Sequence, residues 1–162
     1  MGAAPSLVFL RPGDFMENWA AMLPAAREAG VLPSAKLPLD AADDTVSARD
    51  VGRTVAELLL DPRPGMRIVN LKGPKEYSPA DAAAALSDLL GKPVIAVPSS
   101  RDETIEALRA VGASVDYAAK LADLTDAVNA GHIGAEAGDG ETRHGTITLE
   151  EALRRLVSAG QP

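Results

Sequence analysis

The hydrophobic residues of this chain follow two different spacings. Three short apolar runs, at Leu7–Leu10, Ile68–Leu71 and Val94–Val97, have the length of strands. The first run ends at Pro12-Gly13, which indicates a buried strand followed by a turn. Longer stretches repeat apolar residues every three or four positions, which predicts five to six amphipathic helices. Helices that alternate with a few short strands indicate an α/β fold.

Capping residues predict where several helices start. In the segment Ser78-Pro79-Ala80-Asp81, a cap, a first-turn proline and an acid follow one another, so we expect a helix from there to Leu90. Ser100 with Glu103, and Thr148 with Glu151, repeat the spacing of a capping box. These pairs predict two further helices, and the helical period also continues through residues 115–129.

Two other helices are expected from weaker signals. Asp14 can cap a helix that runs to about Ala29 and that Pro24 should kink or split. Ser47, with Asp50 three residues later, resembles a capping box and predicts a helix. Its expected apolar face consists of Val51, Val55, Leu58 and Leu59.

The remaining stretches predict loops. Residues 31–47 hold prolines and an acidic cluster, and we expect at most one short strand there. Residues 131–145 contain five glycines and should form a loop. We find neither an internal repeat nor a domain linker, so residues 1–162 are expected to form a single domain.

Composition narrows the possible functions. The 162 residues are 46% hydrophobic but only 3% aromatic, so the core must consist mainly of Ala, Val, Leu and Ile. The net charge of −7 argues against nucleic acid and against anionic membrane surfaces as partners. The chain has no Cys, which excludes disulfides and thiolate chemistry. With no long apolar run and no signal peptide, a cytoplasmic location is expected.

The usual catalytic and metal-binding motifs are weak here. Residues Gly131 to Ala137 fit G-x-x-G-x-x-A, but a predicted helix precedes them where a phosphate loop needs a strand. His132 and His144 lie in the same glycine-rich stretch, where we expect their side chains to be solvated. Because a zinc site needs three or four protein ligands, no metal site is predicted. Tyr117 precedes Lys120 by three positions, one short of the Tyr-x-x-x-Lys spacing. Catalytic residues therefore stay unknown at this point.

Four segments in order resemble the NmrA-like branch of the atypical short-chain dehydrogenase/reductases. The first is FLRPGDFMENW, similar to the L-R-P-G-x-F-M-E-N segment of the family. The others are VSARDVGRTVAELLLDP, RIVNLKGPKEYSPADAAAALSDLLGKPV and GTITLEEALRR. Together they cover nearly the whole chain.

The resemblance implies a particular part of a Rossmann-like fold. In the family, the L-R-P-G segment follows the sixth strand of the sheet. The chain is therefore expected to hold the last sheet strands and a mainly helical, substrate-side subdomain. It would lack the N-terminal, Gly-rich dinucleotide-binding half.

The resemblance also implies a cofactor and its site. Family members bind NAD(P), and the segment after the sixth strand lines the nicotinamide end of that site. The matching, cofactor-binding positions are Pro12, Gly13, Phe15, Met16, Glu17 and Asn18. Pro-Gly allows the backbone to approach a flat ring, and the Asn18 amide can donate and accept hydrogen bonds. Alternatively, Phe15 and Met16 are simply core residues and Glu17-Asn18 start a helix. In that case these positions need no cofactor to explain them.

Three functions remain open on these grounds. The first is the C-terminal portion of an NAD(P)-dependent oxidoreductase that acts on a small carbonyl or quinone-like substrate and is inactive alone. The second is a non-catalytic regulator that senses dinucleotide. The third is a standalone interaction or oligomerisation module. Because half a Rossmann fold leaves a strand edge and helix faces bare, we expect a homodimer, a higher oligomer or a complex with a complementary chain.

Overall fold

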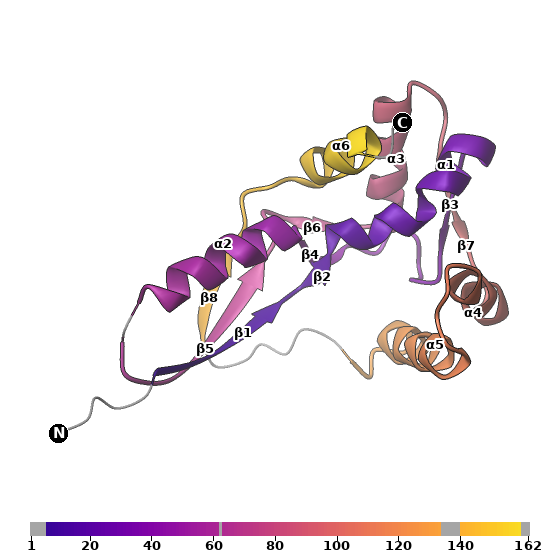
Figure 1. Cartoon of the computed structure of the whole chain (residues 1–162). Coiled ribbons are helices and arrows are strands. Elements are labelled where there is room, and N and C mark those ends of the chain that lie inside the picture. Colours follow the sequence, from indigo (N-terminus) through magenta and orange to yellow (C-terminus); the bar gives the residue numbers. More distant parts are fainter. Residues whose placement is uncertain (1–5, 62, 134–139, 160–162) are drawn as a thin grey trace. The chain divides into compact units, whose positions relative to one another are not determined.

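The computed structural model describes residues 6–61, 63–133 and 140–159, which form two compact units. Unit 1 is built from Met1–Ala21, Asp43–Tyr77 and Ala135–Pro162. Unit 2 is built from Met22–Ala42 and Ser78–Gly134. Figure 1 colours the chain by sequence and labels the elements of both. The expectation of one domain over 1–162 stays a prediction.

The centre of unit 1 is a three-stranded parallel sheet in the order β1-β5-β8. Its strands are β1 (Ser6–Pro12), β5 (Gly65–Lys72) and β8 (Glu141–His144). The register places Pro12 opposite Leu71 and Lys72 opposite His144, so the carboxyl ends of the three strands meet at one edge. The first two strands confirm the predicted apolar runs. However, Leu7 and Phe9 of β1 are about half exposed, so the expectation of a buried first strand is wrong.

A second small sheet of unit 1 has the order β2-β4-β6. The central strand β4 (Asp43–Val46) pairs in parallel with β2 (Asp14–Phe15) and antiparallel with β6 (Glu76–Tyr77). Tyr77 is buried, and its hydroxyl accepts a hydrogen bond from the Leu149 N–H at the start of α6 (Leu149–Ala159), 3.2 Å away.

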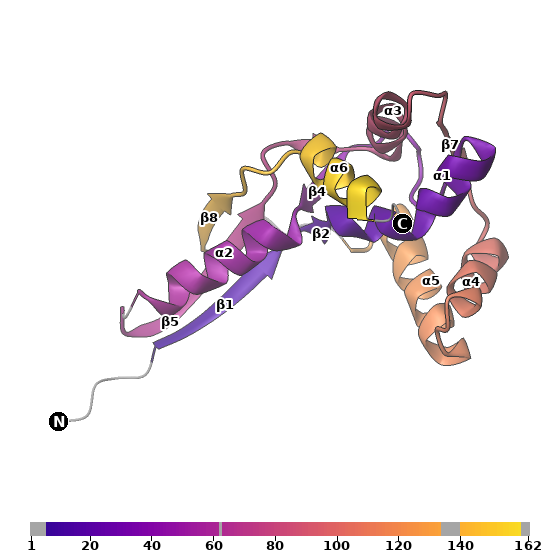
Figure 2. The same ribbon diagram turned by 45° about the horizontal axis from the view of Figure 1, so that its top comes forward.

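Helix α2 (Ala48–Leu59) lies along one face of the parallel sheet, as Figures 1 and 2 both show. Its buried stripe consists of Asp50, Thr54 and Leu58, whereas Val55 and Leu59 are exposed. The apolar face expected from the sequence is therefore wrong at Val55 and Leu59, whereas Leu58 is buried and Val51 half-buried. Asp50 can lie between the helix and the sheet because its carboxylate accepts hydrogen bonds there, as described below.

Unit 2 combines a two-stranded parallel sheet with four helices. Strand β3 (Val31–Ser34) pairs with β7 (Ile95–Pro98). The helices are α1 (Leu23–Ala29), α3 (Pro79–Leu90), α4 (Arg101–Ala110) and α5 (Val115–Asn129). Its core is rich in alanine, as the low aromatic content indicates: Ala82, Ala83, Ala85, Ala118 and Ala122 are all buried.

Most helix starts were predicted correctly because their caps are local. Complete capping boxes join Ser78 to Asp81 and Ser100 to Glu103. Thr148 and Glu151 exchange the same two hydrogen bonds at the start of α6. The structure thus confirms an α/β fold with six α-helices among the described residues.

Three stretches differ from the prediction. Asp14 lies in β2 instead of capping a helix, and a 3-10 helix over Met16–Met22 precedes α1, with Pro24 in the first turn of α1. Residues 31–47 contain two strands, β3 and β4. The predicted loop 131–145 includes strand β8, and its residues 134–139 lie outside the described residues.

Among the described residues, no helix combines the length and the apolar character that a membrane span requires.

Candidate functional site

A glycine follows each strand of the β1-β5-β8 sheet, at the edge where the carboxyl ends meet. Gly13 follows β1, Gly73 follows β5 and Gly145 follows β8. The Gly13 N–H donates to the Leu71 carbonyl oxygen at 3.0 Å, so backbone pairing continues one residue beyond the strand. Open α/β sheets bind ligands beyond the carboxyl ends of their strands. This edge is therefore the candidate functional site.

Close backbone packing explains two of these glycines. A Cβ atom on Gly13 would lie 2.5 Å from the carbonyl oxygen of Asp44, in β4. A Cβ atom on Gly73 would lie closer still to the carbonyl oxygen of Thr45. Any side chain at either position would push β4 away, so β4 can cross this edge only because both residues are glycine.

The predicted cofactor-binding segment lies at this edge, but its residues differ in exposure. Pro12, at the end of β1, and Asn18 are exposed, and the Phe15 side chain is 37% exposed. Met16 is fully buried and belongs to the core of unit 1. The residues of the segment therefore differ in what they can contact. Their assignment to a cofactor stays a prediction.

Glu17 is engaged with the start of α2. One carboxylate oxygen accepts the Ser47 hydroxyl at 2.7 Å, and the other accepts the Ala48 N–H at 2.9 Å. Ser47 is the N-cap residue of α2 and is fully buried. Glu17 therefore places a negative charge at the positive end of the helix, which stabilises both. This contact fixes the segment after β1 against α2.

Asn18 is held by a shorter-range contact. Its Nδ2 donates to Asp14 Oδ1 at 2.7 Å, and the Phe15 N–H donates to the same oxygen at 3.0 Å. The predicted helix cap Asp14 instead closes a turn that orients the Asn18 amide. With Glu17 and Asn18 engaged in this way, the exposed ring of Phe15 and the pyrrolidine of Pro12 remain as flat apolar surfaces.

Asp50 joins α2 to the segment after β8. Its Oδ2 accepts the N–H groups of Thr146 and Ile147, both at 2.9 Å, and its Oδ1 pairs with Arg53 Nη2 at 2.6 Å. The side chain is 1% exposed, and a Cβ atom on Gly145 would overlap its carboxylate. The capping box expected between Ser47 and Asp50 is not formed, since Ser47 Oγ accepts from Arg49 N–H instead. Asp50 is therefore a structural residue.

Charged groups also gather at the ends of β5 and β8. Lys72 Nζ lies 2.8 Å from Asp44 Oδ2, and the hydrogen bond and charge of Asp44 raise the pKa of Lys72 above its ordinary value. His144 Nδ1 lies 2.9 Å from the carbonyl oxygen of Gly73. Because a carbonyl only accepts, Nδ1 carries the proton of the neutral ring and Nε2 is left as the acceptor nitrogen.

Several motifs weighed in the sequence gain no support as sites. Among the described residues, no group of three His, Asp or Glu side chains is arranged to hold a metal ion. The Gly131–Ala137 motif falls largely on residues that the structure does not describe. Tyr117 is 59% exposed, and Lys120 pairs with Asp123 at 3.6 Å.

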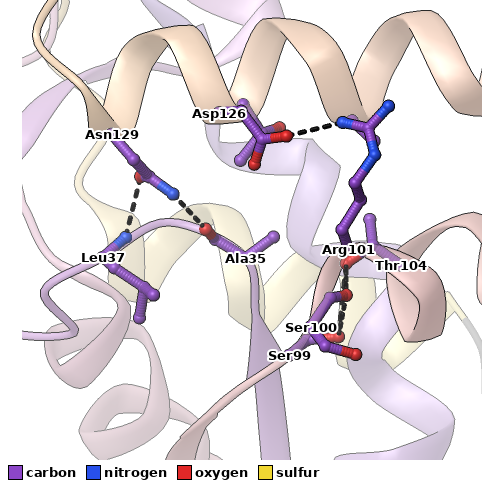
Figure 3. Close-up of a pocket in the computed structure, with 10 residues that line it drawn as sticks. Ala35, Leu37, Ser99, Ser100, Arg101, Thr104, Asp126 and Asn129 are labelled. Carbon is purple, nitrogen blue, oxygen red and sulfur yellow. Dashed lines mark hydrogen bonds and ion pairs between the residues drawn. The ribbon is translucent and has the colours of Figure 1, made fainter.

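Unit 2 contains a small pocket of about 160 Å³, shown in Figure 3. Its polar lining includes Ser99, Ser100, Arg101, Asp126 and Asn129. These groups are largely satisfied by one another or by the backbone. The Asn129 amide accepts the Leu37 N–H at 3.0 Å and donates to the Ala35 carbonyl at 2.8 Å.

Arg101 joins α4 to α5 beside this pocket. Its guanidinium contacts Asp126 and Asp123, both at 2.5 Å. The hydrogen bond from Arg101 lowers the pKa of Asp123, and the two aspartates raise the pKa of Arg101. The charged groups that line the pocket, Arg101 and Asp126, are therefore paired with each other.

Known proteins resemble parts of this sequence and share its fold. No protein-family model matches the chain. The chain is 29% identical over 117 residues to the NAD(P)H azoreductase of Xenophilus azovorans, which covers 72% of this chain and 40% of that protein. It is 27% identical over 130 residues to the uncharacterized oxidoreductase YesF of Bacillus subtilis, with 78% and 44% covered. The chain thus spans less than half the length of these curated relatives.

Solved structures decide the fold. The NADPH complex of the quinone oxidoreductase QOR2 from Escherichia coli superposes with a TM-score of 0.70 at 26% identity, covering 93% of this chain and 53% of that one. The NADP(H) complex of the Citrobacter triphenylmethane reductase gives a TM-score of 0.65 at 20% identity, covering 95% and 53%. The chain therefore shares the α/β fold of these Rossmann-type reductases. It corresponds to the C-terminal part of that NAD(P)-binding Rossmann fold.

The structure places two further glycines at this edge that the sequence did not indicate as site residues. Gly73 and Gly145 belong to the same strand-end edge as Gly13, but only Gly13 was named as a site residue. The Gly73-Pro74 turn after an apolar run was a usable signal for one of them. Gly145 follows a polar strand and had no local signal.

Proposed function

We propose that this chain is the C-terminal portion of an NmrA-like, NAD(P)H-dependent oxidoreductase that reduces a small carbonyl or quinone-like acceptor. In this proposal unit 1 supplies the nicotinamide-side wall of the cofactor site, and unit 2 is the substrate-side subdomain. The relatives named above, an azoreductase that uses NAD(P)H and a quinone oxidoreductase that uses NADPH, support this reaction class.

The single observation that carries the proposal is the fixed position of the segment after β1. Glu17 ties the segment to α2, and Asp14 orients Asn18 within it. The segment lies beyond the carboxyl end of a parallel strand, where α/β folds place their ligands. A rigid backbone with an exposed aromatic ring and an amide suits recognition of the flat nicotinamide ring and its carboxamide.

The described residues fit only one end of the cofactor. A pyrophosphate binds to a glycine-rich turn that opens a helix, where free N–H groups and the helix dipole meet it. The start of α2 cannot serve, because the Glu17 carboxylate already accepts the Ala48 N–H there. Among the described residues, the segment Pro12–Asn18 thus suits the nicotinamide end of NAD(P), while the start of α2 is already occupied by Glu17.

In this proposal the cofactor and the residues of the chain have different roles. When bound, NAD(P)H supplies the hydride. Phe15 and Pro12 would contact one face of the nicotinamide ring and exclude water there, and Asn18 would orient its carboxamide. Because these residues make up only part of a dinucleotide site, we expect weak binding and no turnover by this chain alone.

The proposal is tested by separating the two ends of the cofactor. Trp19 is the only tryptophan and directly follows Asn18, so its fluorescence reports on the segment. We would titrate the chain with reduced nicotinamide mononucleotide and, separately, with adenosine 2′,5′-bisphosphate. The nicotinamide compound should quench Trp19 saturably with a Kd of about 1 mM. The adenosine compound should have no effect.

A pair of variants provides the control. Phe15→Ala should weaken the response to the nicotinamide compound severalfold. Phe9→Ala removes another half-exposed aromatic ring of the same unit, in β1, and should leave the response unchanged. Equal responses to both compounds, or no saturable response to the nicotinamide compound, would contradict the proposal.

A further inference from the structure

Strand β7 of unit 2 has one paired edge and one outer edge. It pairs in parallel with β3, and the described residues place no strand on its other side. The Ile95 N–H donates to the Gly30 carbonyl oxygen at 3.0 Å, and the Ser99 N–H donates to the Ser34 carbonyl oxygen at 2.8 Å. Because backbone groups of successive strand residues point to opposite sides, those of Ala96 point to the outer edge.

The two ends of this outer edge are blocked. The Ser87 oxygen, on α3, accepts the Val94 N–H at 2.8 Å and lies 3.0 Å from the Val94 carbonyl oxygen. At the other end Pro98 has no N–H to donate. Between them, the Ala96 N–H has no acceptor among the described residues. The contact through Ser87 also shows that α3 lies along the outer edge of β7.

A groove of about 610 Å³ lies between α3 and β7. We call it the α3–β7 groove. Its α3 side includes Ala80, Ala83 and Ala84, and its β7 side includes Ile95 and Ala96. The alanine methyl groups are too small to fill the space beside the strand edge. Its volume falls within the range of small-molecule sites, which is roughly 300–1,000 Å³.

The lining of the α3–β7 groove is apolar except for Ser87 and Asp88. The Ser87 hydroxyl is engaged with Val94, as described above. Asp88 is exposed and adds a negative charge to the lining, which repels anions. The Ala96 N–H is therefore the donor that a ligand can use, and a donor in apolar surroundings is satisfied by a carbonyl oxygen.

We propose that the α3–β7 groove binds a neutral, flat carbonyl compound whose oxygen accepts the Ala96 N–H and whose rings lie against the alanines of α3. A peptide strand fits less well, because it needs a row of partners and this edge offers a single free N–H. All residues of the groove belong to unit 2, so the inference does not depend on the nicotinamide segment of unit 1.

The test follows the Ala96 amide of the isotope-labelled chain by nuclear magnetic resonance. The probes are indanone, a flat neutral ketone, and indane, which has the same rings without the oxygen. Indanone should move the Ala96 amide proton downfield saturably, with a Kd of about 1 mM. The Val97 amide, which points to β3, should move less. Indane should bind about tenfold more weakly, because it cannot accept the hydrogen bond.

The charge of the groove is tested with a third probe. Indanone that carries a carboxylate should bind about tenfold more weakly than indanone, because Asp88 repels it. The variant Asp88→Asn removes this repulsion and should bring the two Kd values closer together. It should leave the Kd of neutral indanone nearly unchanged.

A pair of variants makes the result specific to the groove. Ala84→Leu fills the groove from an exposed position of α3 and should weaken indanone binding about tenfold or more. Ala107→Leu, at an exposed alanine of α4 outside the groove, should have no effect. Leucine is a good helix former, and circular dichroism would verify that both variants keep their helices.

Three outcomes would overturn the inference. These are an unchanged Ala96 amide at saturating indanone, equal binding of indane and indanone, and equal binding of indanone by Ala84→Leu and the wild type. The second would make the groove an apolar surface without a carbonyl site. If indanone binds as expected but Trp19 of unit 1 does not respond to reduced nicotinamide mononucleotide, the groove stands and the proposed function fails.

Discussion

The charged side chains that hold each unit together differ in how deeply they are buried. In unit 1, the buried Asp50 carboxylate accepts amides 96 and 97 residues away, and Glu17 reaches Ser47 across 30 residues. In unit 2, the capping boxes at Ser78 and Ser100 act within three residues, and the long-range hydrogen bonds of Asn129 are exposed. Its main ion cluster, around Arg101, is exposed.

This difference shows where polar groups matter for stability. Removing a buried carboxylate that accepts several hydrogen bonds costs much stability, because its donors lose their acceptor where water does not replace it. An exposed ion pair contributes little, because water and salt screen it. Substitutions of charged residues should therefore damage unit 1 far more than unit 2.

The largest effect is expected for Asp50→Ala. The N–H groups of Thr146 and Ile147 would lose their buried acceptor, so the free energy of unfolding should fall by about 2–4 kcal/mol. Urea unfolding followed by Trp19 fluorescence would measure it, because Trp19 belongs to unit 1. Asp102→Ala, at an exposed acid in the first turn of α4, is the matched control. A loss below about 1 kcal/mol would show that the Asp50 contacts do not hold unit 1 together.

A smaller effect is expected for Glu17→Ala. The start of α2 would lose an acceptor comparable to a helix cap, which contributes about 1–2 kcal/mol. Glu17→Gln keeps one acceptor oxygen and should lie between the wild type and Glu17→Ala. The same urea experiment applies, with the exposed Glu106→Ala as control. If Glu17→Ala unfolds like the wild type, the proposed anchoring of the segment after β1 is wrong.

The smallest effect is expected for Arg101→Ala in unit 2. Arg101 lowers the pKa of Asp123 below its ordinary value of 3.8, so this pair stabilises the fold above about pH 4 and the contribution is lost as pH falls through the lowered pKa. The difference in Tm between Arg101→Ala and the wild type should be small at pH 7 and vanish in strong acid.

High salt provides a second check on the Arg101 pairs. The difference should also shrink in about 1 M NaCl, where charges are screened within a few ångströms. Arg109→Ala, at an exposed arginine of the same helix, is the control. A Tm difference that persists at low pH and high salt would contradict the electrostatic explanation.

The parts of the fold that depend on neighbours in sequence were predictable. Ser78 and Asp81 are three residues apart, so the sequence alone indicates their helix start. Strands β4 and β8 were missed because their sequences, DDTV and ETRH, are polar. They are strands only because β2, β6 and β5 offer pairing partners from distant parts of the chain.

The candidate site shows the same limit. The segment Pro12–Asn18 was identified through its family resemblance, and the strand-end geometry could be expected from the apolar run before it. The engagement of Glu17 with Ser47 and Ala48 could not, since nothing in the local sequence relates residues 30 positions apart. The buried position of Asp50 was hidden for the same reason.

The order of the segments along the chain also determines when each unit can fold during synthesis on the ribosome. Every segment of unit 2 has been made once Gly134 is added, and that unit can fold while the chain is still growing. Unit 1 must wait for β8 and for the amides of Thr146 and Ile147 that satisfy Asp50. Until then β1 and β5 remain an incomplete sheet, so the growing chain is exposed to misassembly at these two strands.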